Sequence, residues 1–164
     1  MDEQNAMPAG NGEDTLPSIG IISQYVKDLS FENPNSPAIY QSQTQPRIDV
    51  QFNIGANPVA EDVTEVVLKI DVRADAGDQA AYIVELAYAG LFAFRNIPAE
   101  QLQPFLLGEA PRLLFPFARR ILADAIRDGG FPQLMLEPID FNALYFQQIQ
   151  GQLGGQPGEE AGHA

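Results

Sequence analysis

The chain has 164 residues, of which 45% are hydrophobic, and its formal charge is −13. That charge would repel the phosphates of nucleic acid, so no nucleic acid is expected as a partner. The absence of cysteine excludes disulfides, thiolate catalysis and the usual structural zinc sites. No apolar run approaches the ~18 residues that cross a bilayer, which argues against stable insertion in a membrane.

Both ends of the chain are polar, acidic and rich in glycine. Such segments bury too little apolar surface to offset the entropy of ordering them. We therefore predict disordered acidic tails at residues 1–17 and 151–164, on either side of one folded domain at 18–150. The N-terminus lacks the basic and apolar regions of a secretory signal, so a cytoplasmic location is expected.

Alternating apolar and polar residues predict antiparallel strands in the first half of the domain. The predicted strands are 19–32, 47–54, 64–73 and 79–92, with a hairpin turn at Ala76-Gly77. In the first strand, Tyr25, Leu29 and Phe31 are expected on one side, with Asp28, Ser30 and Glu32 on the other. In the last strand, Tyr82, Val84, Leu86 and Tyr88 are expected to oppose Ala81, Ile83, Glu85 and Ala87.

The face of the sheet that is expected to be wetter still carries apolar residues, namely Val67, Ala81, Ile83 and Ala87. A monomeric sheet would favour Lys, Glu or Thr at such positions. Exposed apolar area of this kind indicates a surface for a partner.

The second half of the domain has helical periodicity, which makes the expected fold class α+β. Asn96 is the predicted N-cap of a helix that is interrupted at Gly108, restarts at Pro111 and ends at Gly129-Gly130. The expected apolar stripe of this helix consists of Leu114, Phe117, Ala118, Ile121, Leu122 and Ala125, and Leu113 and Ile126 widen it. So wide a stripe suits a helix that is shared between subunits. A last helix is predicted to begin at Asp140.

The sequence offers little material for an active site. Its only histidine, His163, lies in the predicted C-terminal tail, and nucleotide-binding and zinc-protease motifs are absent. The densest acid cluster is Glu61-Asp62 beside Glu65, which lacks the alternating oxygen ligands of a cation-binding loop. We therefore expect no cofactor, no metal and no enzymatic activity, although catalysis by carboxylates alone stays open as an alternative.

Five segments resemble the SecB family in order and in spacing. Tyr25-Val-Lys-Asp-Leu-Ser-Phe-Glu-Asn-Pro-Asn-Ser-Pro37 is similar to a stretch near the start of that family, Y-x-K-D-x-S-F-E-x-P-N-x-P. The other segments are Glu61-Asp-Val-Thr-Glu-Val-Val-Leu68, Glu85 with Gly90-Leu-Phe92, Leu114-Phe-Pro-Phe-Ala-Arg119, and Gly130-Phe-Pro-Gln-Leu-Met-Leu-Glu-Pro-Ile-Asp-Phe-Asn-Ala-Leu-Tyr145. Together they cover about residues 18–150.

The resemblance implies a four-stranded antiparallel sheet with helices packed on one face. It also implies a homotetramer built as a dimer of dimers. Such a protein would be a chaperone that binds unfolded precursor proteins and delivers them to SecA, the translocase ATPase. An alternative from another class is an acidic adaptor that recruits a folded basic partner.

The resemblance also assigns residues to two surfaces. The SecA-facing positions correspond to Asp28, Glu32, Ile83 and Glu85. For unfolded clients we expect a groove between the last helix and a 53–60 connection, lined by Phe52, Ile54, Phe141, Leu144, Tyr145 and Phe146. Thr44 stands where many members of the family carry an aromatic residue, so no client contact is assigned to it.

Overall fold

The computed structural model describes residues 16–154, with side chains as far as residue 151. Most of both predicted tails, and His163 with them, lies outside the described residues. The predicted C-terminal boundary at 151 falls inside a helix, which runs on to Gly154.

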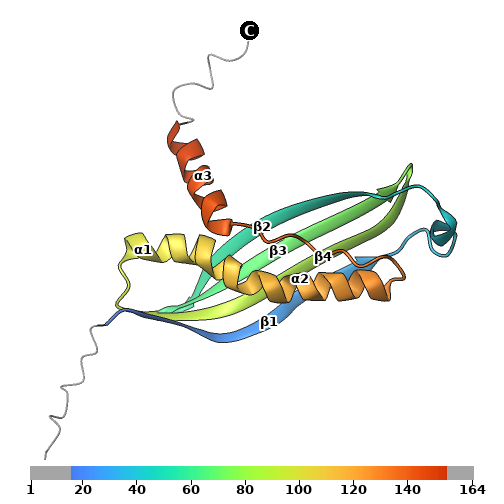
Figure 1. Cartoon of the computed structure of the whole chain (residues 1–164). Coiled ribbons are helices and arrows are strands. Elements are labelled where there is room, and N and C mark those ends of the chain that lie inside the picture. Colours follow the sequence, from blue (N-terminus) through green and yellow to red (C-terminus); the bar gives the residue numbers. More distant parts are fainter. Residues whose placement is uncertain (1–15, 155–164) are drawn as a thin grey trace, which may run out of the picture.

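Four strands form one antiparallel sheet in the order β1-β4-β3-β2. They are β1 (Ser18–Glu32), β2 (Arg47–Ala60), β3 (Val63–Ala76) and β4 (Gln79–Arg95). The helices cover one face of the sheet, here called the helix face, and leave the opposite, outer face open (Figure 1). This is the α+β architecture that was predicted from the sequence.

Two bulges interrupt the alternation of β1. Val26 pairs with Tyr88 and Asp28 pairs with Ala87, so Lys27 is an extra residue between them. A bulge of this kind shifts the parity of everything beyond it. Leu29 therefore lies on the helix face, whereas Tyr25 lies on the outer face with Asp28. The prediction that Tyr25 shares a side with Leu29 was wrong for this reason.

Strand β2 is longer than expected, because residues 53–60 continue the strand instead of forming a connection. Gly55, Asn57 and Pro58 have poor strand propensity, and they concealed this half of the strand in the sequence. Since β2 is an edge strand, proline costs no ladder hydrogen bond on its free side. Between β3 and β4 the predicted hairpin turn is present, and Gly77 adopts the left-handed conformation, with φ of 64°.

After β1, a short 3-10 helix, η1 (Ala38–Gln41), leads toward β2. The helical half begins with α1 (Ala99–Pro104), passes through a π-helical turn, η2 (Phe105–Glu109), and continues as α2 (Ala110–Asp128). The predicted interruption at Gly108 is this π turn and not a break. Asn96 does not cap α1; it has φ of 56°, and its side chain donates to the carbonyl of Leu16.

The last helix, α3 (Phe141–Gly154), projects away from the sheet (Figure 1). Its N-cap is Asp140, as predicted, because the Asp140 carboxylate accepts a hydrogen bond of 3.0 Å from the backbone N–H of Ala143.

The main core lies between α2 and the helix face of the sheet. The α2 side chains that fill it include Leu114, Phe115, Ala118, Leu122 and Ile126. Ile126 is therefore a core residue, while Phe117, predicted to lie in the buried stripe, is 45% exposed and stacks on Tyr88. The stripe is still wider than the sheet requires, because Leu113 and Ile121 are only partly buried.

The outer face is less open than the sequence suggested. Val67 and Ala87 are buried there, and Ile83 is partly exposed. Ala81 was expected on this face but belongs to the main core, because it is the extra residue where the pairing of β3 with β4 shifts between Tyr82 and Ala80. Val67 and Ala87 form a small cluster with Ala89, against which the ring of Tyr25 packs.

Candidate functional site

The four residues assigned to the SecA-facing surface meet on the outer face. Glu32 pairs with Ile83, and Asp28 pairs with Ala87, two residues beyond Glu85 on β4. Because side chains two residues apart on a strand share a face, Ile83 and Glu85 point to the same side as Ala87. The lysine bulge is what brings Asp28 and Glu32 to that side as well.

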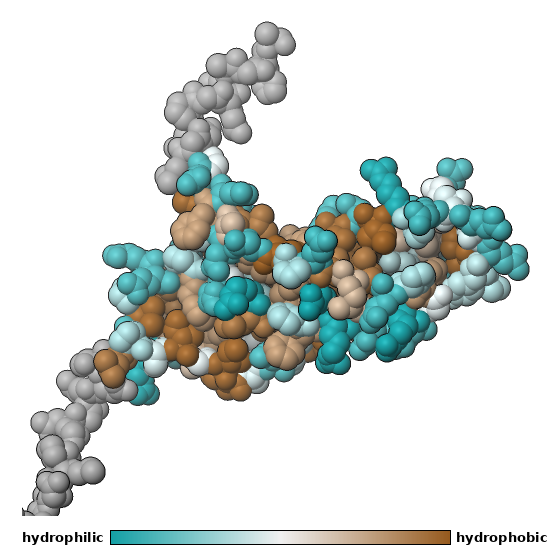
Figure 2. All heavy atoms as spheres, in the orientation of Figure 1, coloured by the Kyte–Doolittle hydropathy of each residue, from teal (hydrophilic) through white to brown (hydrophobic). Residues whose placement is uncertain are grey.

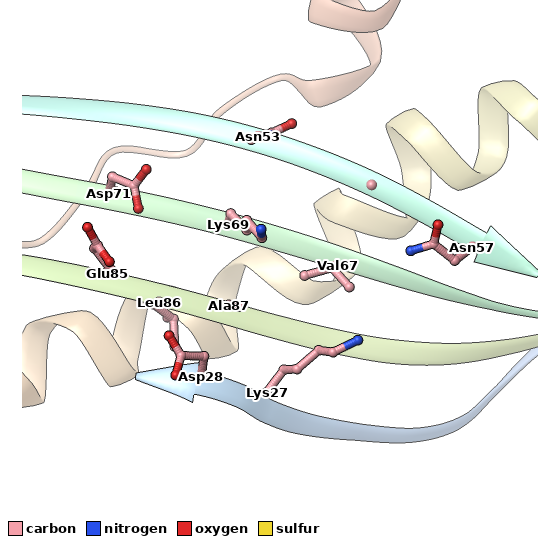
Figure 3. Close-up of a pocket in the computed structure, with 11 residues that line it drawn as sticks. Lys27, Asp28, Asn53, Asn57, Val67, Lys69, Asp71, Glu85, Leu86 and Ala87 are labelled. Carbon is pink, nitrogen blue, oxygen red and sulfur yellow. The ribbon is translucent and has the colours of Figure 1, made fainter. Parts of the chain in front are cut away.

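A shallow hollow of about 550 Å³ lies beside these residues and is lined by Asp28 and Glu85 among others. Asp71 also lines this hollow, although the sequence analysis did not name it as a residue of the SecA-facing surface. Figure 3 shows the carboxylates of Asp71, Glu85 and Asp28 following one another across β3, β4 and β1. The alternation of residues 64–73 already placed Asp71 on this side, but the pairing of Asp71 with Glu85 could not be known from one strand.

We call Asp28, Glu32, Asp71 and Glu85, together with Ile83, the acidic face. The four carboxylates are exposed, and within residues 16–151 none has an ion-pair partner within 4.0 Å. Asp71 and Glu85 are directly opposite on neighbouring strands, an arrangement that is destabilising for like charges. Lys27 and Lys69 also line the hollow. The acidic face is thus suited to guanidinium or ammonium groups of a partner arranged around an apolar contact.

A second surface lies on the helix face, between β2 and α3. A hollow of about 160 Å³ is lined by five of the six residues that were predicted to contact clients, Phe52, Ile54, Phe141, Leu144 and Tyr145, together with Leu107, Asn53 and Gln148. The sixth, Phe146, does not line it; its ring is 5.7 Å from that of Tyr145, and its side chain is 55% exposed. Phe141 is fully buried and packs against Phe52 and Phe115, so it forms the floor.

The apolar surface continues along β2 within residues 53–60, the segment that was expected to bound the groove. A neighbouring hollow of about 470 Å³ is lined by Ala56, Pro58 and Ala60 of β2 and, from the helices, by Leu102, Leu106 and Leu107. Leu107 borders both hollows. We call the two hollows together the client groove. The sequence analysis named residues 53–60 as one wall, but not their strand conformation and not the leucines of the helices that line the second hollow.

The position of α3 depends on the π turn, against which the helix chiefly packs. Glu109 accepts hydrogen bonds of 2.9 Å from Arg112 and of 3.2 Å from Asn142, which lies in the first turn of α3. The bond from Arg112 lowers the pKa of the Glu109 carboxyl, and the bond from Asn142 adds to the effect. A Cβ atom at Gly108 would come within 2.4 Å of the Asn142 side-chain oxygen, so glycine permits this close approach.

The acid cluster noted at Glu61-Asp62 and Glu65 is dispersed by the fold. Asp62 lies in the turn between β2 and β3 with φ of 61°, whereas Glu65 is buried on the outer face. Within residues 16–151, no group of three His, Cys, Asp or Glu side chains is arranged to hold a metal ion. Thr44 is exposed, with its backbone N–H bonded to the hydroxyl of Ser42.

Comparison with known proteins decides the family. The family model "Preprotein translocase subunit SecB" matches residues 12–152. The chain belongs to the SecB family of protein-export chaperones. This confirms the resemblance that the five sequence segments indicated.

Curated members of the SecB family are similar over nearly the whole chain. The protein-export protein SecB of Rhizorhabdus wittichii is 64% identical over 94% of this chain and 93% of its own length. That of Zymomonas mobilis is 61% identical over 98% of each chain, and one from Rhodopseudomonas palustris is 51% identical over 92% of this chain and 99% of its own.

A solved structure confirms the fold. The SecB-like chaperone of Mycobacterium tuberculosis, solved with a peptide from the HigA1 antitoxin, matches with a TM-score of 0.63. It covers 74% of this chain and 90% of its own at 16% identity. In the part of the chain that the structure describes, no helix is both long and apolar enough to span a bilayer.

Proposed function

We propose that this protein is a chaperone that binds unfolded precursor proteins in the cytosol, keeps them competent for translocation and delivers them to SecA. The observation that carries the proposal is the apolar client groove. It lies on the opposite side of the sheet from the acidic face, so that one protomer offers separate surfaces for a client and for SecA.

The groove suits an extended, apolar segment better than a folded surface. From Phe52 to Ala60, alternate side chains of β2 face it, and eight residue steps of strand span about 26 Å. Leucine and aromatic side chains line it, and each large apolar client side chain buried there would contribute about 1.5–3 kcal/mol. In the described part of the chain, β2 pairs only with β3, so its other edge offers backbone groups to an added strand.

The acidic face supports delivery to SecA. Three of its carboxylates are those that the family resemblance assigns to SecA recognition, and Asp71 adds a fourth. Charges of this kind accelerate encounter with a basic surface and set its orientation more than they add affinity.

Assembly into a homotetramer, as a dimer of dimers, is supported by apolar surface at the β1 side of the molecule. In β1 itself, Ile21, Ile22, Val26 and Leu29 are between 41% and 58% exposed. Phe117 of α2 adds to them, and Figure 2 shows apolar side chains interspersed among polar ones over the face that carries the helices. Exposed apolar edge strands are avoided in monomers, and a second copy would cover this one.

No step of this proposal requires a nucleotide or a metal, and no catalysis is involved. The sequence has no phosphate-binding loop, and its densest acid cluster lacks the ligand spacing of a cation-binding loop. Client capture should therefore persist in EDTA and without ATP.

The proposal is tested by light scattering of the purified protein with a chemically unfolded precursor and, separately, with the same precursor in its folded state. We expect a tetramer that retains only the unfolded form, and calorimetry should then detect binding to purified SecA. A stable monomer would overturn the assembly. Retention of the folded form alone would favour the acidic adaptor.

A further inference from the structure

Two residues of the Y-x-K-D motif, Tyr25 and Lys27, are not part of the acidic face, yet they lie beside it. The Tyr25 hydroxyl donates a hydrogen bond to one oxygen of the Glu65 carboxylate. The Lys27 ammonium lies 2.6 Å from the other oxygen. Glu65 is only 8% exposed, although it lies on the outer face. Both contacts join β1 to β3 and therefore pass over β4, the strand between them.

Small side chains on β4 make this crossing possible. The Tyr25 ring packs against Ala87 and Ala89 and against Val67 of β3, which are all less than 9% exposed. Larger residues on β4 would hold the tyrosine ring away from the sheet. The contact network thus includes an apolar layer beneath the polar one.

The same contacts act on the bulge of β1. Tyr25 and Asp28 are three residues apart, so an unbroken strand would place them on opposite faces. They share the outer face only because Lys27 is the extra residue of the bulge. If Tyr25 stays in place and the bulge is lost, Asp28 and Glu32 turn toward the helix face.

The contacts also determine where the charge of Lys27 lies. Lys27 is adjacent to Asp28 in the chain, but its ammonium is held by Glu65 instead. The bond from Lys27 lowers the pKa of the Glu65 carboxyl, and that from Tyr25 does so as well. The carboxylate of Asp28 is left available to a partner.

We propose that Tyr25, Lys27 and Glu65 form a clasp across β4 that fixes the bulge of β1 and withholds the Lys27 charge from the acidic face, so that Glu65 is a positioning residue for recognition of a basic partner. This inference rests on the proposed function of the acidic face in binding SecA. Glu65 itself need not touch SecA.

Glu65→Gln tests the electrostatic half, because glutamine keeps the size and an acceptor for Tyr25 but loses the charge that holds Lys27. Measured by calorimetry at fixed salt, its affinity for purified SecA should fall about two- to fivefold. Adding Lys27→Gln should restore the affinity, since the released cation is then absent. A merely structural role for Glu65 predicts a further loss instead.

Tyr25→Phe tests the bulge, because it keeps the ring over Ala87 and Ala89 and removes only the hydroxyl. Backbone amides of residues 25–32 should exchange with deuterium faster than in wild type. Asp124→Asn is the control, since it removes the ion pairs of Asp124 with Arg120 and Arg127 on α2 and should change neither measurement.

The two proposals fail in different ways. If wild-type protein does not bind SecA while the exchange difference is seen, the assignment of SecA to the acidic face is wrong and the clasp stands. If SecA binds, and Glu65→Gln changes neither affinity nor exchange, the clasp is overturned.

Discussion

The two faces of the sheet are held together by different kinds of interaction. On the helix face, apolar side chains from α2, α3, β3 and β4 fill a continuous core, and partly buried side chains of β1 and β2 pack against it. On the outer face, the apolar cluster consists of Val67, Ala87 and Ala89, and the longer connections are a hydrogen bond and an ion pair to one carboxylate. Burial is worth more than exposed polar contacts, so stability should reside mainly on the helix face.

On the outer face, the residues proposed to bind a partner are not those that stabilise the fold. On the helix face, some residues do both. The acidic face can be altered at little cost in stability, because its carboxylates are exposed and make no described ion pair. The client groove shares Phe141 with the core, so part of it cannot be changed without loosening α3.

The largest effect is expected for Phe141→Ala. The side chain is fully buried between Phe52 and Phe115, and its truncation should lower the free energy of unfolding by about 3–5 kcal/mol. Urea unfolding at a fixed protein concentration measures the loss. Phe146→Ala, five residues along the same helix and 55% exposed, should change stability by less than about 0.5 kcal/mol. Equal losses of stability in the two variants would contradict the distinction between the buried floor of the groove and the exposed part of α3.

A smaller loss, of about 1–2 kcal/mol, is expected for Gly108→Ala. The new methyl group would displace the Asn142 side chain and break its bond to Glu109, which shifts α3 relative to the π turn. Gly151→Ala is the matched control, because among the described residues its added Cβ would meet no atom within 4 Å beyond its own stretch of helix. Hydrogen exchange of residues 141–151 should quicken in the first variant only, and unchanged exchange in both would show that the contact does not position α3.

Much of the sheet was predictable because alternating apolar and polar residues indicate a strand with one buried face. The antiparallel strands, the hairpin at Gly77 and the cap at Asp140 followed from local patterns. The exceptions share a cause: a bulge at Lys27 and weak strand formers at Gly55 and Pro58 break the local pattern while tertiary pairing maintains the strand.

The candidate site was predicted in part for a related reason. Residues of the acidic face were assigned by resemblance, and each strand's alternation placed its own members correctly. Asp71 and the clasp were missed because β1, β4 and β3 are neighbours in an order that no single strand reveals. The contact between Tyr25 and Glu65 joins residues 40 positions apart across an intervening strand.

Charge reversal on the acidic face should affect recognition and leave folding intact. Asp28→Lys, Asp71→Lys or Glu85→Lys should each weaken SecA binding by about 0.2–1 kcal/mol, and a double variant should lose more. Wild-type affinity should fall as salt rises, because screening at physiological ionic strength acts over about 8 Å. Calorimetry against SecA, beside a client-holding assay, measures both effects.

Glu100→Lys is the control for charge alone, since Glu100 is exposed in the first turn of α1, away from the acidic face. It should leave SecA affinity near the wild-type value. If the reversals abolish client holding and spare SecA binding, the two surfaces have been assigned the wrong way round.

Ile83→Asp should also weaken SecA binding, but low salt should restore less of the lost affinity than in the charge reversals, because the lost contact is apolar.

The smallest expected effect is the pH dependence of the contribution of Glu65 to stability, since that contribution does not change with pH over the physiological range. The pKa of Glu65 is lowered from 4.5 by its bond from Lys27 and by that from Tyr25. A carboxyl whose pKa is lower in the folded state stabilises the fold above its unfolded pKa, and this contribution is lost as pH falls through the folded value. The stability difference between wild type and Glu65→Gln should therefore be constant from pH 7 to about 5 and shrink below about 4.5.

Urea unfolding at each pH measures this difference, with Glu61→Gln, at an exposed turn, as the reference variant. A difference that already declines between pH 7 and 6, or that persists unchanged in strong acid, would show that Glu65 is not ionised within the clasp. The clasp would then hold β1 through the Tyr25 ring and its hydroxyl, without the ion pair to Lys27.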